Sequence, residues 1–249
     1  MLELNRISAG YGKQTVLDGI SVDFEKGKLT SIIGVNGCGK STLLKAILGI
    51  LSLSNGEIFI DGENLLTISR NEIAKKIAYL SQGKNIPDMT VEQMVLHGRF
   101  PYLSYPRRYS SHDREVAIKA MEAVGIAEFA HKPLYSLSGG MRQNAYIAMA
   151  FAQDTDYILL DEPTTYLDIA HQLELMRILR KLADSGKGIV TVMHNLPIAF
   201  DFSDKLTAMS NGKIIAYGTP SEICESHIVE DIFGVKIKQV QKGKYLYEY

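Results

Sequence analysis

The segment that decides the fold is Gly34-Val35-Asn36-Gly37-Cys38-Gly39-Lys40-Ser41, which fits the pattern G-x-x-x-x-G-K-[ST]. An apolar run ending at Ile33 precedes it, and a helical pattern over 42–48 follows it. Glycines let the backbone curl so that successive N–H groups face phosphate oxygens, and the helix N-terminus adds partial positive charge. By chance the pattern arises in about one chain of this size in a hundred. The sequence therefore predicts a site for a nucleoside triphosphate.

The roles of the residues in this phosphate-binding loop, which we call the cradle, can be assigned from their chemistry. Lys40 can reach the β- and γ-phosphates, and the Ser41 hydroxyl can bind Mg²⁺, which screens the charge of the triphosphate. Cys38 is expected to be a small spacer whose thiol pKa the helix start would lower. The residues expected to bind the phosphates are Gly34, Asn36, Gly37, Cys38, Gly39, Lys40, Ser41 and Thr42.

Two acids follow a second apolar run. Asp161 and Glu162 come directly after the stretch Tyr157 to Leu160, and Pro163 stops the strand. Ligands bind at the carboxyl ends of parallel strands, so both acids are expected to face the cradle. Asp161 would then join the Mg²⁺ shell, and Glu162 would orient and deprotonate the water that attacks the γ-phosphate. The alternative is a solvated strand end whose acids only prevent edge pairing.

The pattern along the rest of the chain predicts an α/β fold. Apolar residues alternate by two on either side of the Gly10-Tyr11-Gly12 turn, which predicts antiparallel strands. Short apolar runs embedded among helical patterns predict a mostly parallel sheet covered on both faces. These runs are Leu29 to Ile33, Ile77 to Leu80, Tyr157 to Leu160, and Gly188 to Met193.

The stretch from about Pro87 to Asp154 has helical spacing throughout, which predicts a helical insertion. Within it, Arg99 to Ser111 is rich in Pro, Tyr and Arg and is typical of a loop. This loop is either a solvated surface or a docking face for a partner protein. Further along, Ser138-Gly139-Gly140 opens a helix with a serine N-cap and makes a second, weaker candidate anion site.

Together these motifs are recognisable. Leu137-Ser138-Gly139-Gly140-Met141-Arg142-Gln143, placed between the cradle and the acidic strand end, resembles the signature of ATP-binding-cassette (ABC) transporter ATPases. The resemblance covers nearly the whole chain and implies one ABC nucleotide-binding domain over 1–249. Its P-loop, RecA-like ATPase core with an antiparallel β subdomain would occupy 1–86 and 155–249, and its helical subdomain 87–154.

The resemblance also implies roles for residues that the motifs alone do not assign. It places Tyr11 against the adenine ring of ATP, and Gln82 near Mg²⁺ and the attacking water. It places His194 on the γ-phosphate and Asp168 in the loop that links the two sites of a dimer. In this family the signature of one chain contacts the ATP held by another, so Ser138, Gly139 and Gly140 would act in trans. Catalysis would then rest on Glu162, His194 and Gln82, and the metal shell on Ser41, Gln82 and Asp161.

Among ABC ATPases, the stretch 91–102 and the stretch 160–168 resemble those of importers for iron chelates, haem and cobalamin, with molybdate systems nearby. This resemblance implies a homodimer under two membrane permease subunits, supplied indirectly by an external substrate-binding protein. The chain would lie peripherally on the cytoplasmic face of the cell membrane. It would power the uptake of a metal chelate by hydrolysing ATP with Mg²⁺.

Composition limits the alternatives. The 249 residues are 46% hydrophobic and 22% charged, which excludes a disordered chain. Lys+Arg 27 against Asp+Glu 28 gives a net charge of -1, which disfavours nucleic acid as a partner. The two cysteines and the lack of an 18-residue apolar window favour a reducing compartment and membrane spans supplied by another chain.

Three other functions are alternatives to transport. A soluble ABC ATPase acting on nucleic acid or ribosomes is the main alternative, but neither long coiled-coil heptads nor a second cassette is present. A P-loop GTPase or kinase would leave the signature unexplained. The Asn-Lys-x-Asp motif, which would recognise guanine, does not occur in the sequence. A cassette that only binds nucleotide is disfavoured because Lys40, Asp161, Glu162 and His194 are all retained.

Overall fold

The computed structural model describes residues 1–82 and 86–248, and its centre is a six-stranded sheet in the order β10-β9-β3-β8-β7-β6. All neighbouring pairs are parallel except β9 with β10. Every residue of β3, β7 and β8 is buried, as expected for strands covered on both faces. The strands are β3 (Leu29–Ile33), β6 (Ile77–Leu80), β7 (Tyr157–Leu160), β8 (Gly188–Val192), β9 (Lys205–Ser210) and β10 (Lys213–Gly218).

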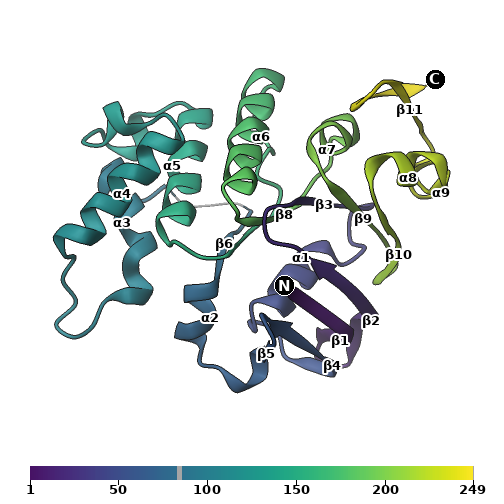
Figure 1. Cartoon of the computed structure of the whole chain (residues 1–249), viewed down its shortest axis with the longest axis horizontal. Helices are drawn as coiled ribbons and strands as arrows, with labels where there is room; N and C mark the ends of the chain where they lie inside the picture. The colour runs from purple at the N-terminus through teal and green to yellow at the C-terminus, as the bar shows by residue number, and fades with distance from the viewer. Residues whose placement is uncertain (83–85, 249) are drawn as a thin grey trace.

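Helices cover both faces of this sheet. Figure 1 shows α6 (Ile169–Asp184) and α7 (Leu196–Phe202) on one side and α1 (Lys40–Ile47) on the other. Asp168 caps α6, accepting a hydrogen bond from the His171 N–H, and α6 buries a stripe that includes Leu175 and Leu179. The predicted parallel sheet between two helical layers is therefore confirmed.

A second sheet, antiparallel, has the order β2-β1-β4-β5. Leu2 pairs with Phe24 and Leu4 with Val22, and these side chains form a core shared with α1. The predicted alternation by two is confirmed. The strands are β1 (Leu2–Tyr11), β2 (Gln14–Phe24), β4 (Leu53–Ile60) and β5 (Glu63–Asn64), and α2 (Arg70–Lys76) follows them.

The described residues between β6 and β7 form helices and add no strand to either sheet. These helices form a separate group at the left of Figure 1. The middle helix, α4, begins at Ser111, earlier than the predicted apolar pattern at Val116, because Ser110 and Asp113 form a capping box. The helices are α3 (Val91–Leu96), α4 (Ser111–Ala123), α5 (Gly139–Ala152) and three 3-10 helices (His97–Tyr102, Ala127–Phe129 and Leu134–Ser136).

Arg99 differs from both interpretations of its segment, because it is neither solvated nor available for docking. Its side chain is only 5% exposed, and its Nε donates to Asp113 Oδ1 at 3.0 Å. Nη1 donates to the carbonyl of Ala152. Burial alone would raise the pKa of Asp113, but hydrogen bonds from Ser110 and Arg99 outweigh it and hold that pKa below its ordinary value. The segment therefore starts with a buried ion pair that joins α4 to the end of α5.

Replacing Asp113 with alanine is expected to lower the free energy of unfolding by about 3 kcal/mol, because it leaves the Arg99 guanidinium buried without its carboxylate. Chemical denaturation of the full chain measures the change. The matched control is Asp18→Ala, which breaks an ion pair with Lys213 whose side chains are 62% and 60% exposed. That control is expected to cost less than about 1 kcal/mol. Equal losses in the two variants would contradict the buried pair as the source of the effect.

Gln153, the C-cap of α5, is hydrogen-bonded to α2 and to the central sheet. Gln153 Nε2 donates to the carbonyls of Ala74 and Ile77, at 2.6 and 3.2 Å. The Tyr102 hydroxyl donates to the Gln153 carbonyl at 3.0 Å. The helical segment is therefore anchored to the start of β6 close to the point where the chain returns to the sheet.

The chain continues past β10 into α8 (Pro220–Glu225), α9 (Ile228–Phe233) and the hairpin of β11 (Lys236–Gln241) with β12 (Lys244–Glu248). The hairpin packs on α7 through Tyr245, whose ring lies 5.1 Å from that of Phe200 and whose N–H donates to Asp201. None of the described helices has both the length and the apolar composition to cross a bilayer.

Candidate functional site

The loop between β3 and α1 is the predicted cradle, and its backbone requires glycine. Gly37 and Gly39 have φ values of 78° and 107°, which side chains rarely tolerate. A Cβ at Gly34 would lie 2.4 Å from the Met209 carbonyl oxygen. The first helical residue is Lys40, so the free N–H groups of α1 face the loop. The backbone therefore has the shape that the motif predicts.

Lys40 lies inside the cradle. Its side chain is nearly buried, and Nζ donates to the carbonyls of Gly34 and Val35 at 2.8 and 3.0 Å. The cradle holds a cavity of about 150 Å³ lined by Val16, Asn36, Gly37, Gly39, Lys40, Ser41, Thr42 and Glu162. The structure thus brings six of the predicted phosphate-binding residues and one of the predicted acids to a single cavity.

Cys38 corrects one expectation. The side chain is buried, and burial raises the pKa of its thiol above the ordinary value, although Lys40 and backbone N–H groups act in the opposite direction. The helix start acts to lower the pKa, but loss of solvent outweighs it, so the predicted net lowering is wrong. The prediction that Cys38 is a small spacer agrees with this burial.

Asp161 and Ser41 meet at the edge of the cradle. The Ser41 hydroxyl donates to Asp161 Oδ1 at 3.0 Å, and the Tyr79 hydroxyl donates to Oδ2 at 3.4 Å. Burial raises the pKa of Asp161 above its ordinary value, the charge of Glu162 adds to this, and the two hydroxyl hydrogen bonds oppose it. Two oxygen groups from distant parts of the chain are thus adjacent where the metal was predicted.

Glu162 is the centre of a second group. His194 Nε2 lies 2.5 Å from Glu162 Oε1, and Gln82 Nε2 donates to Oε2 at 2.5 Å. The Thr165 hydroxyl also donates to Oε2, at 3.2 Å. Glu162 has a φ of 51°, a conformation that costs a non-glycine residue about 1 kcal/mol or more. Gln82 and His194, which follow β6 and β8, therefore both contact Glu162 at the end of β7, so the three residues predicted to serve catalysis lie together.

Sequence reasoning missed Tyr79 and Thr165. Tyr79 lies within β6, where a polar hydroxyl on an apolar run gave no signal. Thr165 follows Glu162 by three residues, and the turn that brings them together depends on the positive φ of Glu162. A search for hydroxyls three residues from a predicted catalytic acid would have found it.

Ser138, Gly139 and Gly140 do not line the cradle cavity of their own chain. Ser138 caps α5, with its hydroxyl accepting from the Met141 N–H at 3.3 Å. Ser138 and Gly139 are exposed, whereas Gly140 is buried. A separate cavity of about 200 Å³, lined in part by Gln82, Arg142 and Glu162, lies beside this helix.

Tyr11 and Asp168 also lie outside the cradle cavity. Tyr11 ends β1 with half of its surface exposed, so its ring is accessible for stacking, and its contact with adenine stays a prediction. Asp168 is exposed at the start of α6, where its hydrogen bonds from His171 hold the pKa of the carboxyl below its ordinary value. The contact of Asp168 across a dimer also stays a prediction.

A family model described as ABC transporter matches residues 17–165. The chain belongs to the ABC transporter family. The match spans the cradle, the signature and the acidic strand end, so the resemblance inferred from those motifs is confirmed. As a member of this family the protein is an ATP-binding cassette and an ATPase.

Three curated relatives match this chain over most of its length. The petrobactin import ATP-binding protein FpuD of Bacillus anthracis is 41% identical over 93% of this chain and 86% of its own length. The ferric enterobactin transport ATP-binding protein FepC of Escherichia coli is 40% identical over 93% of this chain and 86% of its own. The iron(3+)-hydroxamate import ATP-binding protein FhuC of Bacillus subtilis is 40% identical over 94% and 88%.

Solved structures agree with the fold. The ADP conformation of MJ1267, an ATP-binding cassette of an ABC transporter, superimposes with a TM-score of 0.85 at 25% identity, covering 94% of this chain and 98% of that one. The dimeric structure of MJ0796, a bacterial ABC transporter cassette, gives 0.75 at 27% identity, covering 88% and 99%. The predicted cassette fold, with its parallel core, antiparallel β subdomain and helices, is confirmed.

Proposed function

We propose that this ATPase powers the import of a ferric siderophore or a similar metal chelate through a membrane permease. The observation that carries the proposal is identity of about 40% over more than nine tenths of the chain to relatives named for siderophore and iron-hydroxamate import. Haem, cobalamin and molybdate are the other substrates that the sequence resemblance suggested. No relative named above is described as acting on nucleic acid or ribosomes, so that alternative is not favoured.

The residues at the cradle fit Mg²⁺ with ATP. The Ser41 hydroxyl and the Asp161 carboxylate are hard oxygen donors 3.0 Å apart, which is the donor type that Mg²⁺ prefers. Gln82, which contacts Glu162, could add its amide oxygen. When bound, the metal would neutralise phosphate charge. Asp161, whose pKa is raised in the structure, would be stabilised as a carboxylate by that cation.

The remaining residues would act on ATP and water. Lys40 would exchange its two carbonyl partners for phosphate oxygens. Glu162 would take a proton from the attacking water, while Gln82 and His194, which contact its two oxygens, would orient the carboxylate and the γ-phosphate. Tyr11 would stack on the adenine ring.

A second copy of the chain would complete each site. Ser138 and Gly139 are exposed and do not line the cradle of their own chain, which supports a role in trans. The helix N-terminus that they open would place free N–H groups on the γ-phosphate of the facing chain. Closure on ATP and opening after hydrolysis would then drive the permease between its two access states.

Two permease subunits are the proposed membrane partners, supplied by an external substrate-binding protein, with the homodimer at the cytoplasmic face. A groove of about 690 Å³ in the helical segment is the proposed docking site. It is lined by Leu96 and by Tyr109 and Arg114, and none of the described residues that line it lines the cradle cavity. Tyr109 belongs to the segment whose docking role was predicted.

Lys40→Ala is expected to reduce uptake of its substrate by at least about tenfold, since the cradle loses its phosphate cation. Cells carrying the wild type or the variant would be given labelled ferric siderophore, haem, cobalamin or molybdate. The matched control is Lys119→Ala, at an exposed lysine of α4. A loss confined to haem, cobalamin or molybdate would replace the proposed substrate. Co-purification with ribosomes or DNA, without polytopic membrane proteins, would overturn the transport function.

A further inference from the structure

His171, on the first turn of α6, is held by the aspartate that caps the same helix. The His171 backbone N–H donates to Asp168 Oδ1 at 2.9 Å, and the ring Nδ1 lies 2.8 Å from Oδ2. One carboxylate therefore fixes both the backbone and the ring orientation of His171. These two contacts involve only Asp168 and His171, and neither residue belongs to the cradle or to the group around Glu162.

The opposite edge of the imidazole ring lies against the start of α5, the helix that begins in the signature sequence. A Cβ built on Gly140 would lie 2.3 Å from His171 Cδ2 and 2.9 Å from Nε2. The far end of a side chain can often move aside, but this ring is held on its other edge by Asp168. Gly140 is buried, in contrast to the exposed Ser138 and Gly139. The missing side chain of Gly140 therefore makes room for a residue of its own chain.

We propose that His171 is a positioning residue that joins the Asp168 loop to the signature helix, so that both elements meet the facing chain as one rigid unit. The inference rests on the proposed dimer, in which both elements contact the second copy. Asp168 fixes the ring, the ring packs on Gly140, and Gly140 sets the place of Ser138 and Gly139 at the start of α5. Glycine is needed at 140 because of His171, in addition to any contact with phosphate.

The first experiment measures ATP-dependent association of the full chain carrying Glu162→Gln, which is expected to form a stable dimer. Adding His171→Ala is expected to raise the dimer dissociation constant about tenfold, the effect of losing one charge-assisted hydrogen bond. ATP affinity of the monomer is expected to change by less than about twofold. His171→Asn keeps an N–H that can reach Asp168, and we expect it to restore most of the association.

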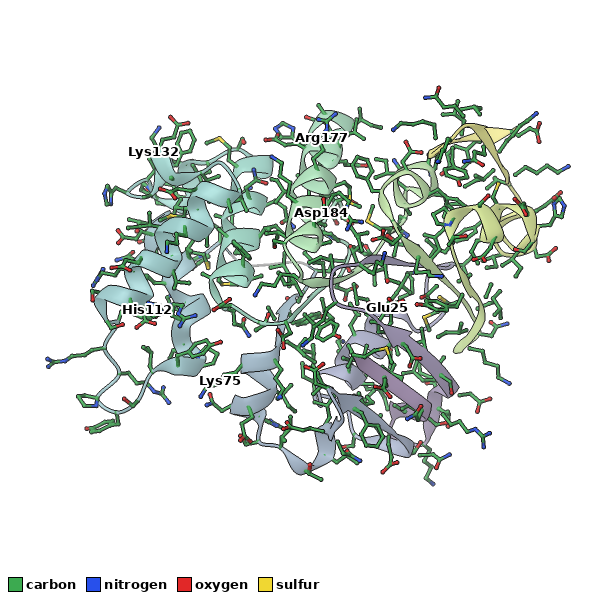
Figure 2. The ribbon with its side chains drawn as sticks, in the orientation of Figure 1. Glu25, Lys75, His112, Lys132, Arg177 and Asp184 are labelled. Atoms are coloured by element: carbon green, nitrogen blue, oxygen red, sulfur yellow. The ribbon has the colours of Figure 1, made fainter. Side chains whose placement is uncertain are left out.

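The matched control is His112→Ala. His112 is an exposed histidine at the start of α4, and Figure 2 shows it on the side of the helical segment that lies away from α6. This substitution is expected to leave both constants within about twofold of the parent.

The second experiment is a double-mutant cycle between 140 and 171 in the same background. Gly140→Ala alone is expected to weaken association by at least about tenfold, because its methyl group would overlap the fixed ring. In the His171→Ala background the same change is expected to add less than about twofold. An equal penalty in both backgrounds would show that Gly140 serves phosphate alone and would overturn the inference.

Other outcomes separate this inference from the proposed function. If the Glu162→Gln parent does not associate with ATP, the proposed dimer fails. If the parent associates and His171→Ala associates equally well, the dimer stands and the positioning role fails. A His171→Ala chain that has lost monomer ATP binding would also overturn the inference, because the residue would then support the fold of the cassette as a whole.

Discussion

Replacing Glu162 with glutamine is expected to lower steady-state ATP hydrolysis by roughly 10²–10⁴-fold, the contribution of a general base. Glutamine keeps the size and the hydrogen-bonding oxygen that Gln82 contacts, but it cannot accept the proton of the attacking water. ATP binding should persist, because Lys40 and the backbone of the cradle are unchanged. The expected state is therefore a dimer that holds two ATP molecules and does not open.

The measurement combines turnover with size-exclusion chromatography in the presence of ATP and Mg²⁺. Glu174→Gln, at an exposed glutamate of α6, makes the same chemical change outside the site and should retain wild-type turnover. Hydrolysis by Glu162→Gln at the wild-type rate would remove Glu162 from its role as base.

Ser138→Arg is expected to abolish turnover, by at least about 10²-fold, because a bulky cation would stand on the surface presented to the second chain. The substitution also removes the N-cap of α5, which costs about 1 kcal/mol of stability and leaves the fold intact. Binding of ATP to the isolated monomer should be unchanged, since Ser138 does not line the cradle of its own chain.

Monomer affinity and turnover are measured separately for this variant. The matched control is Ser136→Arg, which introduces the same cation at an exposed serine two residues earlier. Weaker ATP binding by the Ser138→Arg monomer would contradict the role in trans and would place the serine in the site of its own chain.

Local patterns were sufficient to predict the elements that carry the site. The cradle was predictable because few other sequences combine two required glycines with a lysine at a helix start, and β3 and α1 flank it as expected. Asp161 meeting Ser41 followed from a general rule, that carboxyl ends of neighbouring parallel strands converge. The contact of Gln82 and His194 with Glu162 follows from the same rule, although their selection came from the family resemblance.

What escaped prediction depends on partners that are distant in sequence. Arg99 stands in a stretch rich in exposed residues, and only Asp113 and the end of α5 make its burial possible. The pKa of Cys38 is set by how completely the fold removes solvent, which no local pattern reports. The contact of His171 with Gly140 joins two segments thirty-one residues apart, and each looks like an ordinary capped helix by itself.

Because α5 is hydrogen-bonded in place at Gln153, a rotation about that end would move the other end of the helix the furthest. Gln153 is hydrogen-bonded to α2 and to the start of β6, whereas Ser138 lies at the other end of a 14-residue helix. At about 1.5 Å per residue, the helix is roughly 21 Å long, so a rotation of ~10° about Gln153 carries Ser138 through about 4 Å. That displacement exceeds the length of a hydrogen bond. Such a tilt would pull Gly140 away from the His171 ring, so the packing of that ring against Gly140 keeps Ser138 in a fixed position relative to the Asp168 loop.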